Sequence, residues 1–203
     1  MDRHLFARRV RGRSHTLNTH FELVTVARPP KSGVVGDPAA LAELVQVVTK
    51  ARDRGHVVLV ASLDASSAFD TVSHEVLLSK LRRAAGVDGA ALEVIRTFLT
   101  DRRQRARLSG GRVSSWRALE TGTAQGAVWS PVLFAALVAD LPKHITAGDI
   151  VSYADDVTIC VTAPTVKEAQ AQMDVALEQF AVYARRNRIC PAPEKNQLLA
   201  VGV

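Results

Sequence analysis

The sequence predicts an α+β fold in which helices cover an antiparallel sheet. Three observations lead to this expectation. The β-branched run at residues 57–63 is typical of a buried strand. Two further apolar strands, at 150–154 and 157–161, are separated by only two residues and therefore predict a tight hairpin. Apolar residues at helical spacing across 169–184 indicate the clearest amphipathic helix of the chain.

Residues 1–36 form a basic N-terminal segment to which the pattern assigns no helix or strand. This segment holds seven of the 26 basic residues and two of the 20 acidic ones, so it carries five of the six excess positive charges. Proline and glycine near its end mark a loop, and we expect a poorly ordered terminal segment. Residues 37–203 are nearly neutral, with 19 basic and 18 acidic side chains, and predict one folded domain.

The first half of this predicted domain combines three helices with one strand. Asp37 and Pro38 are typical of a helix start, and this helix ends before the strand at 57–63. Ser73 is placed to cap a second helix. A third helix is predicted over 89–99, where apolar residues recur at helical spacing.

The second half begins with an arginine-rich stretch. Residues 102–119 contain six arginines, no acidic residue and a central Gly-Gly pair, which predict a hairpin with a basic face. An ordinary solvated hairpin is the alternative interpretation. A loop at 121–128 then leads into an apolar helix over 130–141. The last strand is predicted at 197–201, after two prolines.

Composition excludes several classes of protein. The longest apolar stretch, at 132–139, is far shorter than the ~20 residues of a membrane helix, so we expect no membrane partner. No secretory signal opens the chain, and Cys160 and Cys190 cannot form a disulfide framework on their own. We therefore expect an intracellular protein, nuclear or cytoplasmic and not secreted, whose oligomeric state the sequence leaves open.

Acidic residues follow the apolar strands at informative places. Asp155 and Asp156 lie between the two hairpin strands, where a solvated turn is the simplest interpretation. However, Asp64 ends another apolar strand in the same kind of position. If these strands pair side by side, the carboxylates meet at one edge of one sheet. Three such carboxylates could bind two hard cations such as Mg²⁺, as phosphoryl transfer requires.

Four segments in order give this arrangement a specific likeness. Residues 63–74 (LDASSAFDTVSH) resemble the first palm motif of reverse transcriptases from non-LTR (LINE-like) retrotransposons. Residues 125–134 (QGAVWSPVLF) resemble the second motif of that family, and residues 153–156 (YADD) resemble the third. Lys195 stands where the fourth motif has a lysine. The order and spacing of the set make the resemblance specific, and it covers roughly residues 37–203.

The resemblance implies a polymerase palm with part of the fingers and no thumb. It implies RNA-directed DNA polymerase activity, with two Mg²⁺ ions (or Mn²⁺) as cofactors. The expected substrates are a dNTP and a primer on an RNA or DNA template. By the same resemblance, Asp64, Asp155 and Asp156 are the catalytic metal-binding carboxylates. The backbone carbonyl of Ala65 is an expected extra ligand.

The resemblance also assigns residues to the nucleotide. Phe69 is expected to exclude the 2′-hydroxyl of the incoming sugar, and an ordinary core aromatic is the alternative. Gln125 and Gly126 are expected beside the nascent base pair, unless they are only a flexible loop. Lys195 is expected to protonate the leaving pyrophosphate or hold the triphosphate, with a solvated lysine as the alternative. Four arginines are expected to bind nucleic acid: Arg102, Arg103, Arg105 and Arg107.

The chain also departs from the family pattern. Ser67 stands where a lysine is usual, Ala124 where a proline is usual, and Trp129 where a leucine is usual. Pro191 and Ala192 replace a Leu-Asn pair in the fourth motif. The sequence also stops at Val203, just after the last predicted strand, where the resemblance implies a primer grip and a thumb. We therefore expect a truncated fragment that extends primers poorly or not at all. Two alternatives stay open: a non-catalytic nucleic-acid-binding remnant of a retrotransposon polyprotein, and a different two-metal phosphotransferase or nuclease.

Overall fold

The structure is a computed structural model of the 203-residue chain. It divides into two compact units, which we call the sheet unit (Met1–Ala65, Asp140–Ala184 and Pro191–Val203) and the helical unit (Ser66–Ala139 and Arg185–Cys190). The structure describes residues 9–14, 19–24, 38–65, 67–107, 109–124, 126–153 and 156–202.

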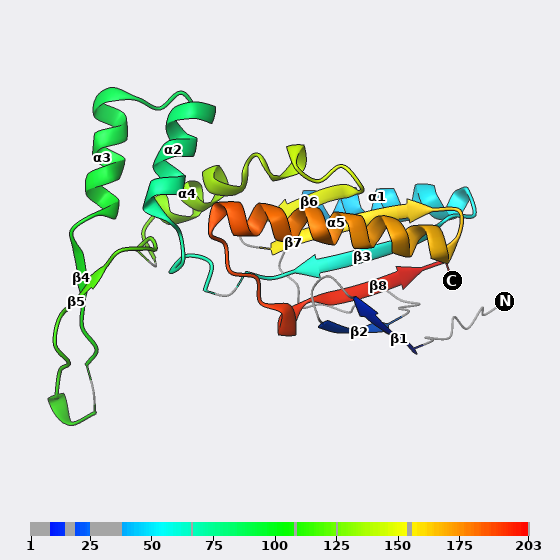
Figure 1. The fold of residues 1–203 in the computed structure, drawn as a ribbon, viewed down its shortest axis with the longest axis horizontal. Helices are drawn as coiled ribbons and strands as arrows, with labels where there is room; N and C mark the ends of the chain where they lie inside the picture. Colours follow the sequence, from blue (N-terminus) through cyan, green and yellow to red (C-terminus); the bar gives the residue numbers. More distant parts are fainter. Residues whose placement is uncertain are drawn as a thin grey trace. The chain divides into compact units, whose positions relative to one another are not determined.

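The sheet unit is built on a six-stranded sheet in the order β1-β2-β8-β3-β7-β6 (Figure 1). Its strands are β1 (Arg9–Ser14), β2 (Thr19–Val24), β3 (Val57–Leu63), β6 (Asp149–Tyr153), β7 (Asp156–Ala163) and β8 (Gln197–Val201). Every neighbouring pair is antiparallel except β2 and β8, which run parallel. The predicted antiparallel sheet is thus confirmed, with one parallel pair toward its edge.

Two helices flank this sheet. In Figure 1, α5 (Val166–Asn187) lies in front of β3 and β7, and α1 (Pro38–Asp53) lies behind them. Ala51 of α1 packs on Val58 and Val60 of β3 and on Cys160 of β7. In β3 every residue except Ser62 is buried, so both faces of the strand are covered. The predicted amphipathic stripe of α5 is buried throughout: Ala169, Met173, Ala176, Leu177, Phe180 and Ala184.

The helical unit packs α2 (His74–Ala84) against both α3 (Gly89–Leu99) and α4 (Trp129–Val138). The Ser73 side chain accepts a hydrogen bond from the N–H of Val76, which confirms the predicted cap of α2. Lys80 Nζ of α2 donates to the Leu137 carbonyl at 2.6 Å, in the last turn of α4, where a cation is favourable. Apolar side chains from all three helices form the core of this unit: Leu77, Leu78, Leu81, Leu92, Ile95, Leu99, Leu133, Phe134 and Leu137.

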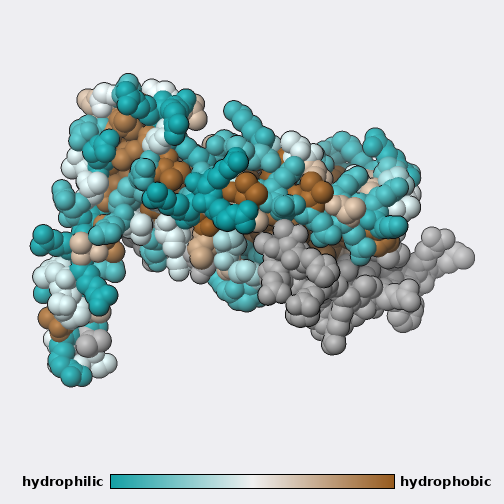
Figure 2. Space-filling view, viewed as in Figure 1, coloured by the Kyte–Doolittle hydropathy of each residue, from teal (hydrophilic) through white to brown (hydrophobic). Residues whose placement is uncertain are grey.

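The arginine-rich stretch forms a hairpin, as predicted. We call residues 102–119 the arginine arm. Its base pairs β4 (Arg102–Gln104) with β5 (Arg117–Leu119), and an isolated bridge joins Arg107 to Val113 farther out. The arm projects away from the helices of its own unit (Figure 1). Each described residue from 103 to 118 is exposed to solvent, and the surface of the arm is mainly hydrophilic (Figure 2).

Several boundaries differ from the sequence-based expectation. The segment 1–36, with no predicted element, contains β1 and β2. α4 ends at Val138, and a separate 3₁₀ turn follows at Leu141–Lys143. β7 begins at Asp156, which pairs with Tyr153, so Asp156 belongs to a strand and not to the predicted two-residue connection. Within the described ranges, the helices include none that is long and apolar enough to cross a membrane.

Candidate active site

Strand register places the predicted acidic residues at one edge of the sheet. β3 and β7 are antiparallel neighbours, and Leu63 pairs with Val157. Asp64 follows Leu63 and Asp156 precedes Val157, so the same register continued by one residue places Asp64 opposite Asp156. The pairing that the sequence analysis required of these strands is therefore present. Asp155, the third expected carboxylate, lies outside the described residues.

The other neighbour of β3 brings Lys195 to the same place. In the β3–β8 ladder Ser62 pairs with Gln197, so continuing it by two residues sets Lys195 opposite Asp64. Lys195 ends a 3₁₀ turn at Pro193–Lys195, and its Nζ lies 3.0 Å from Asp64 Oδ2. The Asp64 side chain is 27% exposed and the Lys195 side chain 56% exposed. The half-buried Asp64 carboxylate therefore has the Lys195 ammonium on its β8 side and the position of Asp156 on its β7 side.

The chain around Pro191 also fixes the backbone of Asp64. The Ala192 N–H donates to the Asp64 carbonyl at 2.9 Å, and the Asp64 N–H donates to Asn196 Oδ1 at 3.2 Å. Ala65 forms an isolated antiparallel bridge with Pro191. Proline has no N–H, so Pro191 cannot donate to the Ala65 carbonyl that the sequence analysis expects as a ligand. Sequence reasoning missed Ala192 and Asn196, because only the tertiary pairing brings them to Asp64.

The donor chemistry of this edge fits a hard divalent cation. Asp64 and Asp156 offer carboxylate oxygens, which Mg²⁺ and Mn²⁺ prefer. Across the described ranges, no three His, Cys, Asp or Glu side chains are grouped so that they could hold a metal. The expected set includes Asp155, which those ranges do not contain. The fit therefore rests on the type of donor and on the strand register.

In the helical unit, Phe69 belongs to the first predicted motif. It is half-buried, and its ring centroid lies 5.4 Å from that of Phe134 in α4, with the ring planes inclined by 50°. Its carbonyl accepts a hydrogen bond from the Thr123 N–H at 2.7 Å. Phe69 is thus packed against the second motif. Its role in excluding the 2′-hydroxyl of the incoming sugar stays a prediction. Gly126 has φ of +80° and is exposed, whereas Gln125 lies outside the described residues.

Gly122 lies in the loop before the second motif and contacts the first motif through its backbone. Its N–H donates to the Val72 carbonyl at 2.8 Å, and its own carbonyl lies 2.8 Å from His74 Nε2. The Arg102 guanidinium donates to that same carbonyl at 3.1 Å. A Cβ at position 122 would lie 2.7 Å from the Asp70 carbonyl oxygen, so only glycine fits this approach. Sequence reasoning missed Gly122 and His74, although a glycine in the loop before the second motif could have suggested close backbone contact.

The four arginines expected to bind nucleic acid fall into two groups. Arg102 is half-buried, with its guanidinium on the Gly122 carbonyl. Arg103, Arg105 and Arg107 are exposed along the arginine arm. Arg102 therefore has a local structural contact. The other three are all exposed, and the Arg105 guanidinium lies over the Trp116 ring.

Comparison with known proteins identifies the family. The chain matches the family model for reverse transcriptase (RNA-dependent DNA polymerase) over residues 14–202, and it therefore belongs to that family. By family it is a nucleotidyltransferase of the RNA-directed DNA polymerase class. Enzymes of this family generally use divalent metal ions.

The related sequences are polymerases of mobile elements. The RNA-directed DNA polymerase from mobile element jockey of Drosophila melanogaster is 28% identical over 156 residues, which are 73% of this chain and 17% of that protein. The Pol polyprotein from the type-1 retrotransposable element R2 of Popillia japonica is 34% identical over 110 residues, 54% of this chain and 18% of that protein. The expected non-LTR resemblance is confirmed. The chain spans less than a fifth of the length of these curated relatives.

Solved structures with the same fold include telomerases. An apo telomerase from Candida tropicalis, truncated from its C-terminal domain, has a TM-score of 0.62 at 10% identity, over 82% of this chain and 36% of that one. Telomerase from the same species in complex with the TWJ fragment of telomeric RNA has a TM-score of 0.57, also at 10% identity, over 82% of this chain and 30% of that one. The α+β fold predicted from the sequence is thus the reverse transcriptase fold.

Proposed function

We propose that this chain is the catalytic palm region of an RNA-directed DNA polymerase, which adds dNTPs to a primer 3′-hydroxyl on an RNA template. One observation carries the proposal: the register of β3 and β7 sets Asp64 opposite Asp156 at one sheet edge, within the stretch that matches the family. The jockey relative carries the name RNA-directed DNA polymerase, which favours RNA over DNA as the template.

The proposed cofactors are two Mg²⁺ ions, with Mn²⁺ as a substitute. Asp64, Asp155 and Asp156 would hold them through carboxylate oxygens, and Ala65 through its backbone carbonyl. Bound there, divalent ions would lower the pKa of the primer hydroxyl and neutralise charge on the phosphates. The segment 191–196 holds Asp64 by three contacts, two to its backbone and one to its carboxylate, and so limits its movement before any ligand binds.

Lys195 has two roles in this proposal. In the free protein its ammonium compensates the charge of Asp64 at 3.0 Å. When substrate enters, the same ammonium can turn toward the triphosphate, because the lysine side chain is long and half-exposed. There it would hold the leaving pyrophosphate or supply its proton.

The remaining proposed contacts belong to the helical unit. Phe69 would exclude the ribose 2′-hydroxyl, and its packing on Phe134 keeps the ring from rotating away. Gln125 and Gly126 would lie beside the base pair being formed. Arg103, Arg105 and Arg107 would bind template or primer phosphates, because they are exposed and lie in a stretch with no acidic side chain.

Single-nucleotide addition under single-turnover conditions tests the proposal. The protein, in excess over a primer annealed to RNA, is mixed with Mg²⁺ and one dNTP, which detects slow addition by a chain whose motifs depart from the family pattern. We expect measurable addition by the wild type and at least a 100-fold slower rate for Asp64→Asn, which corresponds to about 2.7 kcal/mol in activation free energy.

Asp149→Asn is the matched control, because Asp149 is an exposed acidic residue at the opposite end of the β6–β7 hairpin. It should add the nucleotide at the wild-type rate. A DNA template run in parallel tests the preference for RNA. Equal rates for wild type and Asp64→Asn would refute the assignment of Asp64 to the catalytic site.

A further inference from the structure

The arginine arm carries an exposed aromatic side chain that the proposed catalysis does not use. Trp116 is 58% exposed, although burying a tryptophan side chain away from water is energetically favourable. The Arg105 guanidinium lies over its indole ring, 4.6 Å from the ring centroid. This is a cation–π contact, and it favours this orientation of the ring. The arm therefore presents a flat apolar face that is open to solvent.

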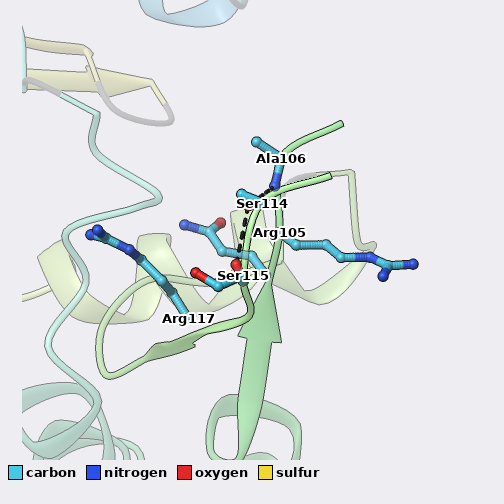
Figure 3. A pocket seen from close by; sticks show the side chains of 6 residues that line it. Arg105, Ala106, Ser114, Ser115 and Arg117 are labelled. Carbon is cyan, nitrogen blue, oxygen red and sulfur yellow. Dashed lines mark hydrogen bonds between the residues drawn. The ribbon is translucent and has the colours of Figure 1, made fainter. Parts of the chain in front are cut away.

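The backbone next to this tryptophan is braced by hydrogen bonds. The Ser114 N–H donates to the Ala106 carbonyl at 2.9 Å, and the Ala106 N–H donates back to Ser114 Oγ at 2.8 Å. Ser114 Oγ in turn donates to the Ser115 carbonyl at 3.1 Å (Figure 3). The first two bonds join the two sides of the arm where β4 and β5 have already ended. The tryptophan is thus carried by a bonded ladder, which lowers the entropy cost of binding to it.

A cavity of about 330 Å³ lies beside this ladder, lined by Gln104, Arg105, Ala106, Ser114, Ser115 and Arg117. In Figure 3 the guanidinium groups of Arg105 and Arg117 extend to opposite sides of the arm. The arm therefore offers positive charge on two sides, with serine hydroxyls and backbone between them. A chain of phosphates can follow such a surface, whereas a single small anion would need the charges to converge.

Single-stranded nucleic acid has the chemistry that this surface recognises. Its phosphates match a stretch of six arginines without an acidic residue. Its unpaired bases expose the faces that stack on an aromatic ring, whereas the bases of a duplex already stack on one another. An acidic peptide would match the charge but has no flat ring to place on Trp116.

We propose that Trp116 is a base-stacking position, and that with Arg105 it makes the arginine arm a binding site for single-stranded RNA or DNA. Arg105 covers one face of the indole, and an unpaired base takes the other. This proposal rests on the proposed function, because it specifies which form of the template the arm holds. It adds a residue that the family motifs do not contain.

Tryptophan fluorescence tests the proposal directly, because the chain has only two tryptophans. Trp129→Phe leaves Trp116 as the sole reporter. We expect a 12-nucleotide single-stranded RNA of mixed sequence to quench its emission saturably. The same RNA annealed to its complement should bind at least about 5-fold more weakly. With Trp129 restored, Trp116→Leu should weaken single-strand binding by about 5- to 100-fold in fluorescence anisotropy, and Trp116→Phe should retain most of the affinity.

Control variants separate stacking from charge and from catalysis. Arg52→Gln removes an exposed arginine of α1 and should change single-strand affinity much less than Arg105→Gln does. Asp64→Asn should bind the RNA as the wild type does, so a failed polymerase assay and a failed stacking site give different results. Circular dichroism checks that each variant is folded. Unchanged affinity in Trp116→Leu, equal affinity for duplex, or equally tight binding of poly-glutamate would each overturn the proposal.

Discussion

Asp64 is held through its N–H, its carbonyl and its carboxylate by one short stretch of chain. The partners are Asn196, Ala192 and Lys195, which lie more than 120 residues away in sequence. Each contact alone is modest, at about 1 kcal/mol for a neutral hydrogen bond. Together they fix both the direction of the peptide and the position of the carboxylate. A residue that binds reacting groups gains most from this, because small displacements of catalytic groups are costly.

In the helical unit, Gly122 is also held by a distant stretch of chain. It lies in the loop before α4, which packs against the segment before α2. Gly122→Ala should lower the free energy of unfolding by about 2 to 4 kcal/mol. Its φ of +85° strains any side chain, and the new methyl would lie 2.7 Å from the Asp70 carbonyl oxygen. Urea denaturation measures the change. Gly110→Ala is the control, because its φ is also positive at +78° but a Cβ there meets nothing within 4 Å. It should cost about 1 kcal/mol.

α5 is tied to the segment 140–146 by Gln179 and Tyr183, which lie one helical turn apart on the same face of the helix. Tyr183 Oη donates to Asp140 Oδ1 at 2.6 Å, and the Thr146 N–H donates to Gln179 Oε1 at 2.9 Å. Gln179 Nε2 donates back to Thr146 Oγ1 at 3.1 Å. Burial, together with the hydrogen bond to Asp140 and its negative charge, raises the pKa of Tyr183 well above its usual value near 10.

Tyr183→Phe should destabilise the fold by about 1 to 3 kcal/mol at pH 8, because it removes the donor to a half-buried carboxylate. The raised pKa gives this difference a pH dependence. Below pH 10 the tyrosine is protonated in both states and its contribution is complete. Above pH 10 the unfolded chain loses the phenol proton while the folded chain keeps it, so the contribution falls. Urea denaturation at pH 8 and pH 11 should show the gap between wild type and variant narrowing. A gap that widens at pH 11 would contradict the raised pKa.

Local signals predicted most elements, because they act within a few residues. Ser73 caps α2 through the N–H of Val76, and Asp88 accepts from the Gly89 N–H where α3 begins. β1 and β2 carried no such signal, since they complete the sheet by pairing with each other and with β8, far along the chain. The residues of the site divide in the same way between local and tertiary signals. The pattern of acidic residues at strand ends pointed to Asp64 and Asp156. Asn196 reaches Asp64 only through the tertiary fold.

The positive charge of the chain is concentrated in two segments. Residues 1–36 carry a net charge of +5, and the arginine arm carries six arginines without an acidic residue. The rest of the chain holds 13 basic and 18 acidic side chains, a net charge of −5. The total of +6 therefore describes no part of the protein well. Outside these two segments the average charge repels nucleic acid, which favours contact at the basic ones.

Removing the outer arm should separate nucleic-acid binding from folding. Gln104 and Arg117 are register partners, so replacing residues 105–116 with Asn-Gly closes a two-residue hairpin on the existing strands. The described residues removed are all exposed, so Tm should change by less than about 2 °C in calorimetry.

This shortened variant loses three arginines and Trp116. Its affinity for single-stranded RNA should fall, and the slope of log K against log salt should become shallower by up to about 2. Unaltered salt dependence would place the phosphate contacts elsewhere. A large loss of Tm would instead mean that the arm supports the fold.

The pairing of Leu63 with Val157 limits which insertions and deletions this gene can tolerate. Deleting one codon within β3 would shift its remaining residues by one place against β7, turn each side chain to the other face, and move Asp64 away from Asp156. The same deletion at the tip of the arginine arm would shorten a solvated loop. In active copies, we therefore expect insertions and deletions to collect between residues 105 and 116, while β3 and β7 keep their length even where their apolar residues are exchanged.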